Sequence, residues 1–279
     1  MIRQKKVMCF PGGVKKAFTV SYDDAVEQDG QLIRLMEQYK IRGTFNISTG
    51  WLVEEGTVFA EGEVHRRLTV SQCKKVYDSP VCEVSTHGFS HPFLTTLEPE
   101  MIMDQIVSDR EMLEQMFGCV VMGHAYPYGY YNETVMKILD LAGVHYARTV
   151  QSTGKFDLPA DWLELNPTCH HDDKNLKNLT EEFLKLAPDV YPQMFYVWGH
   201  TFEFERNNNW YVIRELFQNI SGKKDIWYAT NGEIYDYVKA YKNLEWSVDG
   251  TKVINRSAQT LWVEIDGTMR KLEPGFQTI

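Results

Sequence analysis

Short apolar runs alternate with amphipathic stretches along most of the chain. Runs rich in β-branched and aromatic residues predict strands at 17–22, 43–47, 81–85, 119–125, 144–149, 194–198 and 226–229. Apolar residues at helical spacing predict helices at 32–39, 69–77, 99–117, 133–142, 180–186, 210–220 and 232–241. Thr95 or Thr96 is expected to cap the helix at 99–117, and Gly118 to end it.

This alternation of strands and helices predicts an α/β fold with a parallel sheet and helices on its outside. About seven such units suit a closed or partly closed barrel. The end of the chain differs, because two Asp-Gly turns (at 249–250 and 266–267) separate runs of alternating apolar and polar residues. We therefore expect a barrel over residues 1–245 and a small antiparallel β extension, packed on the barrel, over residues 246–279.

Composition and charge argue against several classes of function. The net charge of −9 disfavours a nucleic-acid partner, and no apolar run approaches the roughly 18–20 residues of a membrane helix. The basic residues Arg3, Lys5 and Lys6 precede an apolar run of only 7–10, which is short for a signal peptide. The five cysteines are scattered and odd in number. These features favour a reduced, cytoplasmic setting for the chain as given, unless a signal has been removed.

Unusual polar groups follow several predicted strands. Asp23 and Asp24 end the first strand, His87 and His91 follow the third, and His200 follows the strand at 194–198. Because barrel active sites lie at the carboxyl ends of the strands, these groups are expected at one rim. Two imidazoles four residues apart on a tight turn, with a carboxylate from Asp24, form a ligand set suited to Zn²⁺.

A second carboxylate beside this set has a possible role of its own. Asp23 would be free to take a proton from water if the chain leaves strand geometry there. The alternatives stay open at this point: an Asp pair after a strand is often a turn or a helix cap, and a lone His such as His200 is often an ordinary core or rim residue.

Four short motifs in this order resemble the polysaccharide deacetylase family, also called the NodB-homology domain or carbohydrate esterase family 4. They are Tyr22-Asp23-Asp24, His87-x-x-x-His91, Tyr126-Pro127-Tyr128-Gly129 and Trp198-x-His200, and the resemblance covers about residues 15–241. It implies a distorted (β/α)7-type barrel that uses a divalent metal, zinc first and cobalt, nickel or manganese as alternatives. The implied activity is removal of N- or O-acetyl groups from an acetylated carbohydrate.

The resemblance also implies roles for individual residues. Asp23 resembles the catalytic base and His200 the catalytic acid, while the metal ligands would be Asp24, His87 and His91. The backbone N–H of Tyr128 resembles an oxyanion donor, with Tyr126 and Trp198 beside the substrate.

The sequence departs from the family pattern at three places, one of which is Trp198, where an aliphatic residue is common. The third motif usually opens with an Arg that orients the base, and Ala125 stands there. His124 would point away on a strand, so a basic group elsewhere on the rim, such as Arg148, is an equal candidate. We expect a hydrogen-bond donor within about 3 Å of the Asp23 carboxylate. The Asp-Trp pair that usually lies near the acid His would be Asp161-Trp162.

Further polar and aromatic residues are candidates for the substrate cleft. Cys169-His170-His171-Asp172-Asp173 is either a second metal site or a rim segment, with His170, His171 and Glu203 lining the cleft. Aromatic residues that would stack on sugars or simply pack are Trp51, Tyr130, Tyr131, Phe202, Trp210 and Tyr211. The alternatives to a sugar deacetylase are an amidase of the same fold acting on another C–N bond, and a non-catalytic carbohydrate-binding barrel. The sequence does not indicate the oligomeric state.

Overall fold

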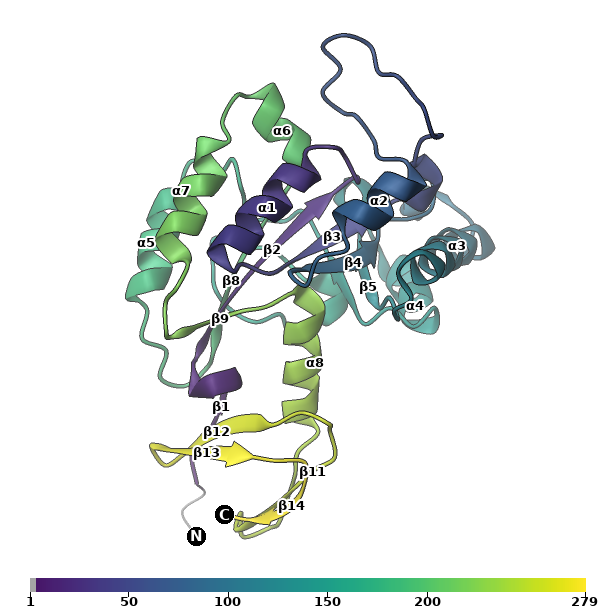
Figure 1. Cartoon of the computed structure of the whole chain (residues 1–279). Helices are drawn as coiled ribbons and strands as arrows, with labels where there is room; N and C mark the ends of the chain where they lie inside the picture. Colours follow the sequence, from purple (N-terminus) through teal and green to yellow (C-terminus); the bar gives the residue numbers. More distant parts are fainter. Residues whose placement is uncertain (1–3) are drawn as a thin grey trace.

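The computed structural model describes residues 4–279, so Arg3 lies outside the described residues. Parallel strands form one curled eight-stranded sheet in the order β6-β5-β4-β3-β2-β8-β7, and β9 pairs with β2 (Figure 1). The strands are β2 (Lys16–Asp23), β3 (Gly43–Ile47), β4 (Cys82–Thr86), β5 (Gly123–Ala125), β6 (Tyr146–Arg148), β7 (Cys169–His170), β8 (Gln193–Gly199) and β9 (Ile226–Tyr228). The predicted α/β barrel with a separate β appendage is therefore confirmed.

An irregular segment lies between the two edge strands of the curled sheet. The Thr149 N–H donates to the Leu165 carbonyl at 3.1 Å, next to β6. On the other side, the Thr168 N–H donates to the Tyr196 carbonyl of β8 at 2.8 Å. These bonds satisfy backbone groups that an open sheet edge would leave exposed. The curled sheet has the shape of a half-barrel, and the carboxyl ends of its parallel strands lie at one rim.

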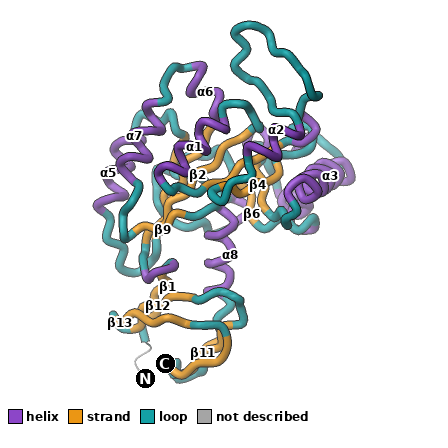
Figure 2. Tube along the Cα trace, in the orientation of Figure 1, coloured by secondary structure: helices purple, strands orange, loops and turns teal. Residues whose placement is uncertain are grey.

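Helices cover the outside of the curled sheet (Figures 1 and 2). They are α1 (Asp29–Tyr39), α2 (Val70–Val76), α3 (Pro99–Phe117), α4 (Glu133–Leu141), α5 (Leu176–Lys185), α6 (Thr201–Arg206) and α7 (Tyr211–Ile220). The last helix, α8 (Asn231–Lys242), instead runs from the sheet to the antiparallel strands at the end of the chain. Their apolar stripes are buried: Leu32 and Met36 of α1 and Ile213 and Phe217 of α7 join one core with Phe18 and Val20 of β2. Burial of these side chains supplies most of the driving force for docking the helices on the sheet.

The boundaries of the elements test the predictions from periodicity. β3 and α3 have the predicted bounds, and Gly118 ends α3 with a left-handed φ of 65°. The predicted cap of α3 is wrong, because residues 94–96 form a separate 3-10 turn in which the Thr96 Oγ1 donates to the Phe93 carbonyl. Glu98 precedes α3 instead, without a side-chain capping bond. The segments β1 (Lys6–Cys9), β7 and α6 escaped prediction, since four, two and six residues are too short for a clear period.

The end of the chain forms antiparallel sheets together with the start. β12 (Leu261–Ile265) pairs with both β1 and β13 (Thr268–Leu272), and β11 (Lys252–Asn255) pairs with β10 (Glu245–Trp246) and β14 (Gly275–Thr278). The β12–β13 hairpin turns at Asp266-Gly267, where both φ angles are positive, as predicted from the sequence. Buried residues of this part, such as Leu261 and Val263, share a core with Ile234 and Tyr237 of α8. Within residues 4–279, no helix has the length and apolar character needed to cross a membrane.

Candidate active site

A pocket of about 460 Å³ lies at the carboxyl ends of the parallel strands. Every strand from β2 to β6, and β8, contributes to its wall directly or through the loop that follows it. The lining residues are Asp23, Asp24, Trp51, His65, His87, His91, Tyr126, Tyr128, Arg148, Val150, Trp198 and His200. The strand-end residues singled out from the sequence therefore share one rim, as expected for this architecture.

The turn after β2 presents two neighbouring carboxylates to the same pocket. β2 ends at Asp23, and Asp24 and Ala25 adopt positive φ angles of 86° and 52°. Because successive strand residues point to opposite faces, only a departure from strand geometry lets both side chains face one side. The sequence predicted this departure at Asp23, and the structure places it one residue later, at Asp24, where a positive φ is uncommon for a residue other than glycine.

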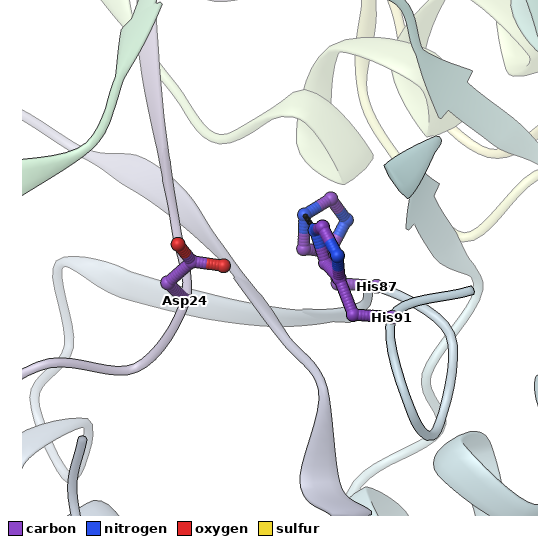
Figure 3. Close-up of side chains that lie close together, drawn as sticks. All are labelled: Asp24, His87 and His91. Atoms are coloured by element: carbon purple, nitrogen blue, oxygen red, sulfur yellow. Dashed lines mark hydrogen bonds between the residues drawn. The ribbon is translucent and has the colours of Figure 1, made fainter. Parts of the chain in front are cut away.

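Asp24, His87 and His91 form a group whose ligand atoms all lie within 4.8 Å of one another. In Figure 3 the Asp24 carboxylate faces the two imidazoles across a short gap. The Nε2 atoms of His87 and His91 are 3.1 Å apart. The His87 Nδ1 donates to the Ala125 carbonyl at 2.7 Å, which leaves its Nε2 unprotonated, the form of nitrogen that can bind a metal. This donor set fits a divalent metal ion.

Two features of the residues around Asp24, His87 and His91 also suit a divalent metal ion. The Asp24 Oδ1 is buried and has no hydrogen-bond partner among the described residues. Burial lowers the pKa of His87, and burial together with the nearby His87 lowers the pKa of His91 to about 3. Both imidazoles are consequently neutral, which is the form that binds metal. Asp109 of α3 fixes this turn, because its carboxylate accepts from the His87 N–H at 2.9 Å.

Arg148 supplies the positive group that the sequence lacks at position 125. Ala125 of β5 and Arg148 of β6 are paired positions on neighbouring strands, so the guanidinium reaches the space beside Asp23 from one strand further along. The Arg148 Nη2 donates to the Asp23 Oδ2, and the Asn46 Nδ2 donates to the Asp23 Oδ1 at 2.8 Å. The expectation of a donor beside Asp23 is thus confirmed.

The electrostatics of Asp23 follow from this pairing. Burial disfavours a charged carboxylate, but the positive charge around Asp23, first of all that of Arg148, outweighs burial and holds the pKa of Asp23 below its usual value. The Arg148 side chain is 1% exposed and lies over the Trp198 ring at 4.3 Å. His124 takes no part, since its Nδ1 lies 2.9 Å from the Thr86 Oγ1. Asp23 is therefore ionised and held in place by buried donors.

His200 lies between two carboxylates at the start of α6. Its Nε2 is 3.7 Å from the Asp23 Oδ2, and its Nδ1 is 3.4 Å from the Glu203 Oε2. Burial disfavours the imidazolium, but Glu203 and Asp23 outweigh burial and raise the pKa of His200. The His170 Nε2 also contacts the Glu203 Oε2, at 3.1 Å. This arrangement favours the protonated form of His200 at the edge of the pocket.

Asp161 and Trp162 do not fill the place that the family pattern suggested for them. Asp161 accepts from the Leu163 N–H in a short turn, and Trp162 packs edge-on against Tyr235 of α8. Neither residue lines the pocket. The carboxylate beside His200 is that of Glu203, which is brought there because α6 starts at the end of β8.

The remaining candidates divide between the pocket and the core. Tyr128 is 47% exposed at the pocket wall, whereas the Tyr126 hydroxyl donates to the Leu163 carbonyl from a buried position. His170 is partly exposed, but His171 is fully buried against Tyr22 and Phe204 and faces a groove between α5 and α7.

The aromatic residues divide in the same way. Trp51 lines the pocket, with His91 stacked at 4.5 Å and the Arg67 guanidinium 3.7 Å from its ring. Tyr131 stacks on Tyr126, and Trp210 packs on Phe204. Tyr130 and Tyr211 are exposed, and neither lines the pocket. Phe202 lies 4.3 Å from the ring of His65.

The sequence analysis missed His65 and Asn46 as residues of this site. His65 belongs to an irregular polar segment and follows no strand, so no motif marks it. Asn46 lies within β3, where a polar residue in a buried strand is the one available signal.

Comparisons with known proteins agree with this geometry. The sequence profile of the polysaccharide deacetylase family matches residues 12–147. No curated protein matches the chain. Among solved structures, the chain is similar to the Xyl-CE4 domain of a multidomain xylanase from the hindgut metagenome of Trinervitermes trinervoides, with a TM-score of 0.54 and 14% identity over 84% of this chain and 96% of that domain.

Two further solved structures are similar. A CE4 family pseudoenzyme from Bacillus anthracis has a TM-score of 0.50 and 16% identity, over 82% of this chain and 68% of that one. The deacetylase PplD of Streptococcus pyogenes, in complex with acetate, has a TM-score of 0.44 and 23% identity over 52% of this chain. The matched part spans 61% of that streptococcal protein and 45% of a polysaccharide deacetylase from Bacillus cereus.

At these identities the structural likeness shows the fold alone, and the profile match concerns residues 12–147. The matched residues 12–147 include the carboxylates at 23 and 24, both imidazoles of the metal-ligand group and the turn at Tyr128. Residues 12–147 of the chain therefore match the polysaccharide deacetylase family, in agreement with the resemblance drawn from the sequence motifs.

Proposed function

We propose that this protein is a metal-dependent hydrolase that removes N- or O-acetyl groups from a carbohydrate. The observation that carries the proposal is the position of Asp23, paired with a buried Arg148, next to the converging Asp24, His87 and His91. A carboxylate that is ionised, buried and free of the ligand set has the properties of a general base. The family match supports the acetylated carbohydrate as the substrate class.

Asp24, His87 and His91 would hold the metal ion. Two imidazole nitrogens and one carboxylate oxygen favour zinc, and the same set accepts cobalt, nickel or manganese. When bound, a divalent ion in such a set polarises the acetyl carbonyl and lowers the pKa of water.

The residues around the ligand set would move the protons of the hydrolysis. Asp23 takes a proton from the water that attacks the acetyl carbon, and His200 gives its proton to the leaving nitrogen or oxygen as the acyl bond breaks. The products are acetate and the free amine or hydroxyl. The Tyr128 backbone N–H is proposed to donate to the oxygen on which negative charge develops. Trp198 and Tyr126 would form the wall around the acetyl methyl group.

The alternatives predict different measurements. A carbohydrate-binding barrel without turnover drew its main support from Ala125, and Arg148 now supplies the missing positive charge. A same-fold amidase acting on another C–N bond would release no acetate from acetylated sugars. Acetate release from a panel of N- and O-acetylated saccharides, together with the metal content of the same preparation, separates these functions.

Replacing His91 with Ala is expected to strip the bound metal while the fold persists. His91 supplies one of three ligands and lies on a turn at the pocket wall, so its loss weakens binding without opening the core. Elemental analysis of purified wild type and variant, after equal exposure to zinc, measures the effect, and a thermal melt checks the fold. His145→Ala, at a histidine outside the pocket, serves as the control. Stoichiometric metal in His91→Ala would refute the ligand set.

Glu203→Gln is expected to shift the basic limb of the kcat–pH profile to lower pH. His200 must carry a proton to act as the acid, so kcat falls as pH rises through the pKa of His200. Glu203 and Asp23 raise that pKa, and removing the charge of Glu203 lowers it. The activity is therefore lost at a lower pH than in the wild type. Glu181→Gln, at an exposed position of α5, should leave the profile unchanged.

A further inference from the structure

A histidine outside the ligand set contacts one of its members. The long loop between the turn Thr49–Trp51 and α2 projects from the body of the molecule in Figures 1 and 2, and His65 lies near its return. The His65 Nε2 is 3.0 Å from the Asp24 Oδ2, and the His65 ring lies 4.3 Å from that of Phe202. Because an ionised carboxylate only accepts hydrogen bonds, the Nε2 is the donor.

The two carboxylate oxygens of Asp24 differ in their hydrogen-bond partners. The Oδ2 accepts from His65, while the Oδ1 is buried and has no partner among residues 4–279. His65 does not belong to the group of three whose ligand atoms all lie within 4.8 Å of one another. It therefore contacts a ligand and does not share the position that the three ligands surround.

The position of His65 is fixed by its neighbours in the chain. The Arg66 side chain donates to Glu27 at 2.7 Å and to both oxygens of Glu205 at 2.9 and 3.0 Å. The Glu27 N–H donates to the Arg66 carbonyl at 2.9 Å, and Arg67 lies over the Trp51 ring. The loop tip is exposed, but these contacts anchor its return on the loop that follows β2 and on α6. The loop thus delivers His65 to Asp24 in a defined geometry.

We propose that His65 is a positioning residue of the metal site, which orients Asp24 so that its Oδ1 faces the imidazoles of His87 and His91. This inference rests on the proposed metal-dependent function. Hydrogen-bond partners of metal-ligating carboxylates fix the ligand before the ion arrives, and their mutation typically weakens metal affinity by about 10–100-fold. His65 would do so from a loop that lies outside the barrel strands.

The test is the zinc dissociation constant, measured by competition with a chromophoric chelator on the whole chain. His65→Ala is expected to weaken zinc binding by about 10–100-fold. His65→Gln retains an N–H donor on a side chain of similar reach and should restore part of the affinity. His145→Ala removes a histidine outside the pocket and should bind zinc as the wild type does. Thermal melts of the metal-free proteins check that His65, whose side chain is 32% exposed, is not needed for folding.

Cobalt substitution separates positioning from direct ligation. If His65 only orients Asp24, the d–d absorption spectrum of the cobalt-loaded His65→Ala protein matches that of the wild type once the site is saturated. A spectrum that shows the loss of a nitrogen ligand would overturn the positioning role, and so would an unchanged zinc affinity in His65→Ala. A wild-type protein that binds no zinc would refute the metal site itself, and this inference with it.

Discussion

Replacing Asp23 with Asn is expected to lower the rate of acetate release by about 10²–10⁴-fold while bound metal is retained. The substitution keeps the shape of the side chain but removes the basic carboxylate, and its single amide oxygen can accept from only one of the two donors, Asn46 or Arg148. Asp24, His87 and His91 are untouched, so the metal content should equal that of the wild type. Initial rates and elemental analysis on the same preparation measure both quantities.

Replacing His200, the proposed general acid, provides the second half of this test of the proton-transfer roles. His200→Ala should also keep the metal and lose rate, because His200 belongs to the proton-transfer pair and not to the three-residue ligand set. Normal hydrolysis by both variants would refute the proposed division of roles, even with the metal in place. A loss of metal in Asp23→Asn would instead place Asp23 among the ligands.

Arg148→Met is expected to destabilise the metal-free protein by about 3–5 kcal/mol and to abolish most of the activity. Arg148 is buried beside Asp23, so its removal leaves a buried carboxylate without its counter-charge, which is a costly arrangement. Methionine fills much of the same volume over Trp198, so the change tests charge more than packing. Denaturant unfolding in the presence of a chelator gives the free energy of unfolding.

The matched control is the double variant that carries Asp23→Asn together with Arg148→Met. With both charges absent, the free energy of unfolding should return toward that of the wild type, while activity stays lost. The Nε and Nη1 of Arg148 lack acceptors among the described residues, so removing the guanidinium also removes unsatisfied buried donors. If Arg148→Met alone is as stable as the wild type, the ion pair does not support the fold.

The sequence by itself determined the class of fold and much of the site. Hydrophobic period is a local property, so β3 and the long helix α3 appear at their predicted residues, and the alternation of strands and helices implies a parallel sheet. Because all strands of such a sheet end at one rim, the residues after them are brought together regardless of the distance along the chain. Asp23, Asp24, His87 and His91 were identifiable for this reason.

Only the tertiary structure decided which side chains support those residues. Arg148 takes the place of an arginine at position 125 because β5 and β6 pair in a register that sets Ala125 beside Arg148. Glu203 replaces Asp161 next to His200 because a short helix starts where β8 ends. His65 reaches Asp24 through a loop anchored by ion pairs. Such contacts depend on the register of paired strands and on the residues that anchor a loop. The local spacing of residue types along the sequence encodes neither of these, because the two residues of each contact come together only when the helices, strands and loops pack.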